Sequence, residues 1–277
     1  MPDHLADANV MLLPLVGRIA ERIPEHTMLR IYDYPSFARF LRSVANRFVP
    51  DGLTEVRVAG GELAGTRLFL DLRREKNLWL GTFEPWVQEA ITTNLRPGEG
   101  AWDVGAFIGY HTILMQRAAG VGCVAAFEPN PMNRVRLERN LASNAATDVR
   151  VVPMAAGKSR GYSRMWHDSV LGSGSHLGPG GEVECETIPL DALLPELPVP
   201  RLVKIDVEGA ETDVLAGAYR IVHEVRPVWV VEVHGPDGWG AVHQLQSVGY
   251  RVQRFGKGMD VKTNLTVGGP AHIIALP

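Results

Sequence analysis

The stretch from Trp102 to Thr112, Trp-Asp-Val-Gly-Ala-Phe-Ile-Gly-Tyr-His-Thr, constrains the fold more than any other part of the sequence. A short apolar run ends in a glycine turn at Gly105, and Gly109 opens an apolar helical pattern. A strand, a tight turn and a helix N-terminus in succession form a corner where backbone N–H groups and the positive end of the helix dipole face a ligand. The stretch therefore predicts a nucleotide-type binding corner.

From residue 100 onward, apolar runs alternate with helical patterns. Alternation of this kind predicts an α/β fold with a parallel sheet covered on both faces. Tyr250–Phe255 and His272–Leu276 are expected to pair as a hairpin at the sheet edge. The expected strands are 101–104, 123–127, 149–152, 201–206 and 228–233, and the expected helices are 109–119, 131–144 and 209–222.

Two regions interrupt or precede this rhythm. Residues 157–187 are rich in glycine and serine and are expected to form a lid-like loop. Residues 1–50 have apolar side chains at helical spacing, and 53–80 is typical of a hairpin split by Gly60-Gly61. We therefore expect a helical and hairpin extension over 1–80, serving as a cap or a homo-oligomer contact, and a main domain over 81–277 with a first helix at Val87–Leu95.

Composition excludes several classes of protein. The net charge of −3 provides no basic field that would favour nucleic acid. No apolar stretch is long enough to span a membrane, and the first residues lack the basic region of a signal peptide. The chain has two cysteines, and neither is in a metal-type spacing. So few cysteines are typical of a protein from a reducing compartment. A cytoplasmic protein is expected.

The glycine corner discriminates between ligands. A dinucleotide fingerprint needs glycines where this chain has Phe107 and Tyr110, and a phenylalanine obstructs close approach of a pyrophosphate. A ligand without a pyrophosphate, such as S-adenosylmethionine, fits more easily. Glu128 follows the next strand, 25 positions after Asp103, where a carboxylate can accept both ribose hydroxyls. Because enzymes that use NAD also have an acid there, Glu128 indicates adenosine and leaves the reaction open.

Further polar residues gather where two later strands end. Lys204, Asp206 and Glu208 share one side of a strand by two-residue alternation, at the sheet edge where ligands bind. Glu211 fits a site or a simple helix-start role about equally well. His234 ends the following strand and could take a proton from a hydroxyl.

Together these segments resemble the FkbM family of S-adenosylmethionine-dependent methyltransferases. The matching runs are Asp-Val-Gly-Ala-Phe-Ile-Gly-Tyr-His-Thr (103–112), Ala-Phe-Glu-Pro-Asn-Pro (126–131), Leu-Val-Lys-Ile-Asp-Val-Glu-Gly-Ala-Glu (202–211) and Val-Glu-Val-His (231–234), with Phe83-Glu84 before them. The resemblance covers roughly residues 80–277. One departure is Phe107, where most relatives have asparagine.

The resemblance implies a class I methyltransferase (Rossmann-like) fold, with a seven-stranded sheet of order 3-2-1-4-5-7-6 and strand 7 antiparallel. It also implies O-methylation of a small-molecule hydroxyl, on a sugar or a polyketide-type specialised metabolite. A NAD-dependent oxidoreductase and a non-catalytic S-adenosylmethionine-binding protein are the alternatives.

The resemblance and the residue patterns together give a set of expected site residues. The expected cofactor-binding residues are Glu84, Asp103, Gly105, Ala106, Phe107, Gly109, Thr112, Glu128, Pro129, Met154 and Ala155, the last two near the adenine. The expected catalytic residues are His234 or Asp206 as the base, with Lys204, and the expected substrate contacts are Glu208, Trp166 and His176. A rival version places Mg²⁺ on Asp206, Glu208 and Glu232, which the carboxylates permit without requiring it.

Overall fold

The computed structural model describes residues 49, 51–166, 176–178, 180–256 and 271–277. The helices expected over 1–50 lie outside this range, in which Val49 is the one described residue of that segment. By its internal contacts the chain divides into two compact units, residues 1–85 and 86–277.

The first unit contains the expected hairpin. Strand β1 (Leu53–Arg57) pairs antiparallel with β2 (Arg67–Asp71), and helix α4 (Lys76–Leu80) follows. The antiparallel pairing of the two strands confirms the hairpin, and Leu68 and Leu70 of β2 are fully buried. Gly81 ends α4 in the left-handed conformation.

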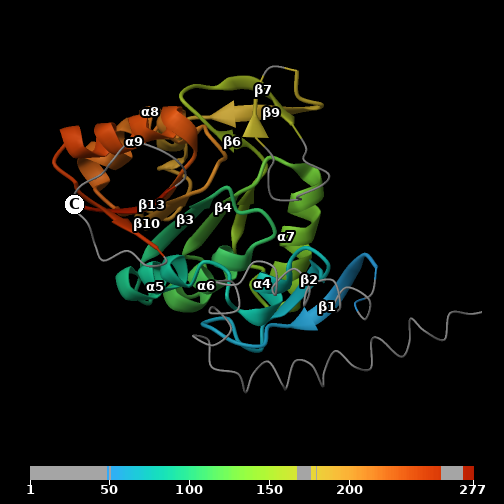
Figure 1. Cartoon of the computed structure of the whole chain (residues 1–277). Coiled ribbons are helices and arrows are strands. Elements are labelled where there is room, and N and C mark those ends of the chain that lie inside the picture. The colour runs from blue at the N-terminus through green and yellow to red at the C-terminus, as the bar shows by residue number, and fades with distance from the viewer. Residues whose placement is uncertain (1–48, 50, 167–175, 179, 257–270) are drawn as a thin grey trace, which may run out of the picture. The chain divides into compact units, whose positions relative to one another are not determined.

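A seven-stranded sheet forms the centre of the second unit (Figure 1). Its order is β5-β4-β3-β10-β11-β13-β12, and β13 is antiparallel to both of its neighbours. Numbered along the chain within this sheet, the strands give the predicted order 3-2-1-4-5-7-6. The strands are β3 (Gly100–Val104), β4 (Val124–Phe127), β5 (Arg150–Val152), β10 (Pro200–Ile205), β11 (Val228–Val233), β12 (Arg251–Phe255) and β13 (Ala271–Leu276).

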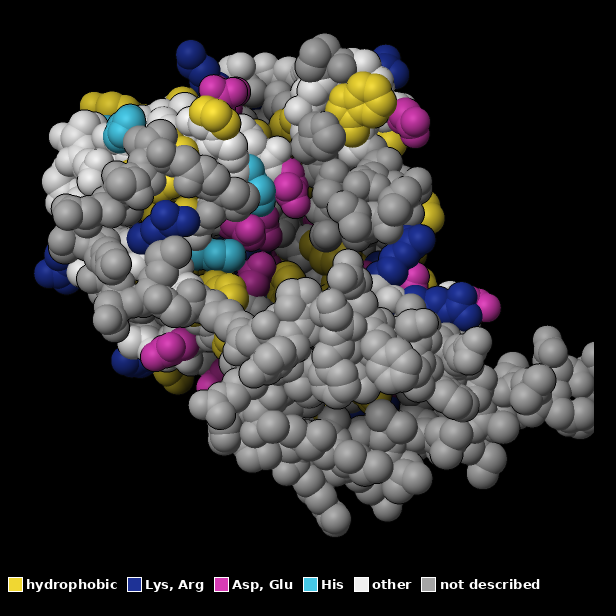
Figure 2. Space-filling view, in the orientation of Figure 1, with side chains coloured by type: hydrophobic (Ala, Val, Ile, Leu, Met, Phe, Trp, Pro, Cys, Tyr) yellow, Lys and Arg dark blue, Asp and Glu magenta, His cyan; other side chains and the backbone are white. Residues whose placement is uncertain are grey.

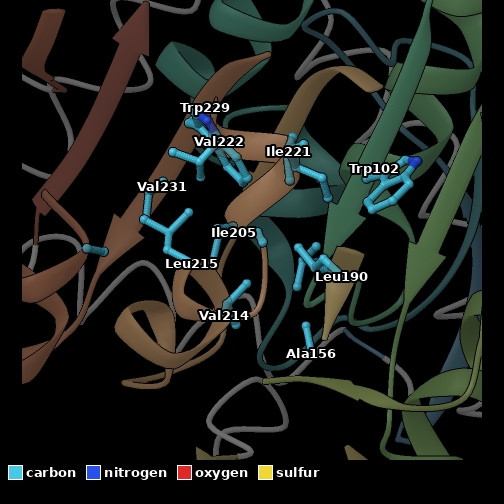
Figure 3. Packing of buried hydrophobic residues seen from close by; sticks show 14 of the residues in the cluster. Trp102, Ala156, Leu190, Ile205, Val214, Leu215, Ile221, Val222, Trp229 and Val231 are labelled. Atoms are coloured by element: carbon cyan, nitrogen blue, oxygen red, sulfur yellow. The ribbon is translucent and has the colours of Figure 1, made fainter. Parts of the chain in front are cut away.

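Helices cover both faces of this sheet. In Figure 1, α5 (Pro85–Asn94) and α6 (Tyr110–Ala119) lie on one side, and α8 (Glu211–Ala216) and α9 (Gly235–Ser247) lie on the other. Alternate strand residues such as Trp102, Trp229 and Val231 point toward the α8–α9 side and pack into one apolar cluster (Figure 3). Within the described ranges, no helix has the length and hydropathy needed to cross a bilayer.

Two helical predictions need comment. The pattern at 131–144 is α7 (Pro131–Ser143), which Asn130 caps by accepting from the N–H of Met132 at 2.9 Å. The helix expected over 209–222 is wrong in its length, because α8 ends at Ala216 and a π-helical turn follows at Ile221–Val225. Gly217 follows the end of α8, and a Cβ at this position would lie 2.0 Å from the carbonyl oxygen of Gly157.

The expected lid-like loop is wrong for the described part of 157–187. That part forms a second sheet of order β6-β9-β7-β8, with β7 (Gly161–Trp166) antiparallel to β9 (Val183–Ile188). The remaining strands are the short β6 (Ala155–Ala156) and β8 (His176–Leu177). Met165 and Cys185 are buried on one face of this sheet, and their neighbours along each strand are exposed. This alternation is typical of a strand, although the glycine content of the segment predicted a loop.

Candidate active site

The glycine corner is built as expected and is sterically tight. Gly105 follows β3 with φ 83°, and a Cβ on it would lie 1.8 Å from the backbone oxygen of Asp206. Gly109 begins α6 with φ 87°, where a Cβ would meet the Leu137 side chain at 2.5 Å. Only glycine therefore fits both positions without displacing a neighbour. The first of these contacts joins the turn directly to the acidic strand end of β10.

Phe107 occupies a strained position in this corner. Its φ is 50°, a left-handed conformation that a phenylalanine adopts at a cost of about 1 kcal/mol or more. Its backbone N–H donates to Oε2 of Glu128 at 2.8 Å, and the Arg136 guanidinium lies 5.8 Å from the centre of its ring. The strained backbone thus aims an N–H group at the carboxylate expected to hold the ribose.

Glu128 is buried at the end of β4, and burial is the main influence on its charge. Oε1 accepts the N–H of Asn130 at 2.8 Å, while Oε2 accepts the N–H of Phe107. Burial raises the pKa of Glu128 to about 7, although these two hydrogen bonds and one from Asn133 act in the opposite direction. A carboxylate can accept about four hydrogen bonds, so with these three made Glu128 has room for about one more, to a ligand hydroxyl.

Asp103 lies within the protein and contacts other side chains. Thr112 donates its hydroxyl to Oδ2 of Asp103 at 2.6 Å, and Lys204 Nζ lies 3.4 Å from Oδ1. Asp103 and Lys204 are register partners on β3 and β10, so their side chains share a face of the sheet. Both expected cofactor residues, Asp103 and Thr112, are almost fully buried. They position the start of α6 against the sheet.

Lys204 connects the two halves of the site. Its ammonium nitrogen is 3.4 Å from a carboxylate oxygen of Asp103 and 3.4 Å from one of Asp206. It is buried, and its charge is compensated on both sides. The same face carries Glu232 of β11 and His272 of β13, which are also register partners, with Glu232 Oε2 3.3 Å from Nε2 of His272.

Carboxylates surround His234, which begins α9. Nδ1 is 2.9 Å from Oε1 of Glu211, and Nε2 is 3.5 Å from oxygens of both Glu208 and Glu232. Burial lowers the pKa of His234, but the acidic neighbours outweigh it and raise the pKa to about 11. Both ring nitrogens then carry protons at neutral pH. This environment argues against the predicted role of His234 as a base and leaves Asp206 as the candidate.

Glu211 is a site residue that the sequence left undecided. Its side chain is fully buried, and Oε1 accepts the N–H of Gly209 at 2.9 Å as well as facing His234. The chain turns just before Glu211, with positive φ angles of 54° at Glu208 and 109° at Gly209. Glu211 therefore fixes both the turn that presents Glu208 and the orientation of the imidazole.

The geometry gives limited room for a metal. Ligand atoms of Asp206, Glu232 and His234 lie within 4.8 Å of one another, which differs from the expected set by having His234 in place of Glu208. A protonated imidazole does not bind a metal ion, because metal ligands must be deprotonated. The Mg²⁺ hypothesis stays a prediction.

A cavity of about 750 Å³ opens beside this cluster. It is lined by Glu208 and by residues that sequence reasoning missed, notably Lys158, Tyr162 and Arg164. The spacing of Tyr162 and Arg164 on alternate positions could have revealed a strand. Figure 2 shows acidic side chains and histidines gathered in a hollow of the face in view.

The other expected site residues lie on several separate segments of the chain. Met154 packs against the main apolar cluster, and Ala155 is buried in β6. Trp166 is 40% exposed on β7 and does not line the cavity. Ala106 is buried, and Pro129 lies between Glu128 and the residue that caps α7. Glu84 belongs to the first unit. The His176 side chain is outside the described range. The roles expected of these residues stay predictions.

The methyltransferase FkbM domain matches residues 103–252, which is just over half of the chain. The chain belongs to the FkbM methyltransferase family. The matched range begins at Asp103 and includes Glu128, Lys204, Asp206 and His234, so the family assignment covers the corner and the acidic edge alike.

One curated relative is a hexuronic acid methyltransferase, AglP, from Haloferax volcanii. It is 36% identical over 138 residues, which is 48% of this chain and 55% of the relative. The chain thus spans about half the length of this relative.

Among solved structures, methyltransferase FkbM from Methylobacillus flagellatus matches with a TM-score of 0.46 and 18% identity, covering 74% of this chain and 53% of that one. A precorrin-6y C5,15-methyltransferase from Geobacter metallireducens matches with a TM-score of 0.43 and 20% identity, covering 69% and 86%.

Proposed function

We propose that this protein transfers a methyl group from S-adenosylmethionine to a hydroxyl oxygen of a sugar. The observation that carries the proposal is the contact between the glycine corner and the acidic strand end. Gly105 packs on the backbone of Asp206, and Lys204 lies between the carboxylates of Asp103 and Asp206. The corner that would hold an adenosine and the carboxylate that would receive a proton are therefore parts of one rigid arrangement. The name of the Haloferax volcanii relative supports a sugar as the acceptor.

The residues present fit the cofactor. A buried carboxylate at Glu128, with about one acceptor position left beyond its hydrogen bonds to Phe107, Asn130 and Asn133, suits a ribose hydroxyl. The backbone N–H of Phe107, at φ 50°, donates to that carboxylate, and a phenylalanine in place of the fingerprint glycine disfavours a pyrophosphate. Bound S-adenosylmethionine supplies an electrophilic methyl group. The chain's contribution is to hold the acceptor hydroxyl in line and to remove its proton.

Asp206 is the residue proposed to take that proton. Its carboxylate is partly exposed, with 24% of the side chain accessible, and it lies 3.4 Å from the Lys204 ammonium, which holds it in place. As the hydroxyl oxygen gains the methyl group, its O–H proton passes to the Asp206 carboxylate and then to solvent. A base in this position typically contributes about a hundred- to ten-thousand-fold to the rate.

The test compares Asp206→Asn with Asp148→Asn. Asp148 accepts the N–H of Gly122 at 2.6 Å before β4, so its variant controls for losing a carboxylate that serves structure alone. Transfer of labelled methyl to a sugar panel is measured together with S-adenosylhomocysteine affinity by calorimetry. We expect Asp206→Asn to lower turnover by about a hundredfold or more with cofactor affinity within about twofold. Full turnover in Asp206→Asn, with the control equally active, would remove Asp206 as the base.

Other parts of the proposal have separate tests. Family membership favours S-adenosylmethionine over NAD, and calorimetry with both ligands discriminates between them. Unchanged activity in EDTA would exclude the Mg²⁺ version. A homo-oligomer contact through the N-terminal segment and a cytoplasmic location stay predictions from the sequence.

A further inference from the structure

The cavity beside His234 has walls from two parts of the second unit. Tyr162, Arg164 and Glu184 line it from the small sheet, and Glu208 and Asp213 line it from the turn after β10 and from α8. Glu208 also lies 3.5 Å from His234. A molecule held in this cavity would therefore reach the acidic cluster directly.

Part of the wall made by the small sheet is its outer face, and Ser163 and Thr187 line the cavity from the face that carries Met165 and Cys185. Arg164 and Glu184 are register partners on β7 and β9, so they share a face, and Tyr162 joins them by two-residue alternation. Met165 and Cys185 alternate with these residues and pack on the other face. Tyr162 is 71% exposed, which is unusual for so large a ring, and it lines the cavity.

The chemistry of the lining selects against an apolar acceptor. Nine of the fifteen lining residues carry a charge or a hydroxyl group, and apolar atoms supply somewhat less than half of the lining surface. Burying an apolar polyketide here would remove water from charged groups without replacing their hydrogen bonds, which costs free energy. A polyhydroxylated ring would replace those hydrogen bonds. The polar lining residues are Lys158, Ser159, Tyr162, Ser163, Arg164, Glu184, Thr187, Glu208 and Asp213.

We propose that this cavity is the acceptor subsite and that it takes a pyranose-type sugar ring. The C–H face of the ring packs on the Tyr162 side chain, and the ring hydroxyls hydrogen-bond to Glu208 and Glu184. The hydroxyl bound to Glu208 is the one at the end of the cavity nearest His234, from which Glu208 is 3.5 Å away. This inference rests on the proposed methyl transfer, which it deepens by naming the site and class of the acceptor.

The experiment measures binding of methyl glucopyranoside, methyl galactopyranoside and methyl glucuronide by saturation-transfer NMR and calorimetry, with S-adenosylhomocysteine present. The variants are Tyr162→Ala and Tyr162→Phe, and Tyr219→Ala is the control. Tyr219 is a comparably exposed tyrosine, at 65%, which stacks on His223 and does not line the cavity. A naphthol serves as the apolar probe.

We expect Tyr162→Ala to weaken binding of at least one glycoside about tenfold, while Tyr162→Phe and Tyr219→Ala stay within about threefold of the parent protein. S-adenosylhomocysteine affinity should be the same in all four proteins. The inference is overturned if Tyr162→Ala binds the glycosides as the parent does, if no glycoside binds while S-adenosylhomocysteine does, or if the naphthol binds more tightly than every glycoside. Glycoside binding without S-adenosylhomocysteine binding would instead refute the proposed cofactor and leave the subsite standing.

Discussion

Protonation of Glu128 should make the stability of this protein depend on pH. Burial raises the pKa of this carboxyl from 4.5 to about 7 in the folded chain. The folded protein therefore holds the proton more tightly than the unfolded chain does. The resulting stabilisation is fully present below pH 4.5 and is lost as the pH rises through about 7.

The size of the effect follows from the shift. A rise of roughly two and a half pKa units corresponds to about 3 kcal/mol of unfolding free energy, since each unit is worth about 1.4 kcal/mol. More than half of the loss should occur between about pH 5 and pH 6.5. His234, with a pKa raised from 6.5 to about 11, also loses stabilisation as the pH rises, but only above this interval.

The assay is urea unfolding at several pH values for the parent protein and for Glu128→Gln. Glutamine has the same volume as glutamate but cannot titrate. Its amide NH₂ group faces one of the two backbone N–H donors, and this donor–donor contact should lower the unfolding free energy by about 1–3 kcal/mol at every pH. The decisive quantity is therefore the slope of the unfolding free energy against pH, which should fall sharply in the variant. Equal slopes between about pH 5 and pH 6.5 in the two proteins would refute the assigned protonation of Glu128.

The same protonation should affect cofactor binding. Ribose hydroxyls that donate to Glu128 favour its ionised form, so binding should release a proton below pH 7. Calorimetry of S-adenosylhomocysteine binding in buffers of different ionisation enthalpy measures that proton.

Three further outcomes are expected. Gly105→Ala should lower the unfolding free energy by about 3 kcal/mol or more. The control Gly98→Ala has a similar φ of 86° but nothing within 4 Å of the added Cβ, and it should lower the unfolding free energy by about 1 kcal/mol. Equal losses in urea unfolding would contradict the clash with Asp206. Phe107→Gly should be more stable than Phe107→Ala by about 1 kcal/mol in the same assay, because only glycine adopts φ 50° without strain, and the reverse order would argue against a strained position. The ring nitrogens of His234 should both be protonated at pH 8 in ¹⁵N NMR spectra, and titration of the ring below pH 7 would disprove its carboxylate cage.

Local patterns in the sequence predicted most of the main sheet, because its strands are apolar runs followed by turn and helix signals. The corner at Gly105 and Gly109 followed from glycine spacing, and the carboxylate at Glu128 followed from its place after the next strand. The strand order came from the family resemblance, and the observed pairing agrees with it. The small sheet was missed because β7 and β9, although six residues long, flank a glycine-rich segment, which favours a loop when only the local pattern is considered.

Contacts between distant segments decided the rest. The sequence could assign His234 a titratable ring, but only the fold places Glu208, Glu211 and Glu232 around it and so makes it a stable cation. His272 joins the polar face because β13 returns antiparallel beside β11. The cavity at Tyr162 exists because β7 and β9 pair. A local pattern determines which residues form a strand, whereas the charge state of a side chain depends on neighbours that only folding brings within a few ångströms.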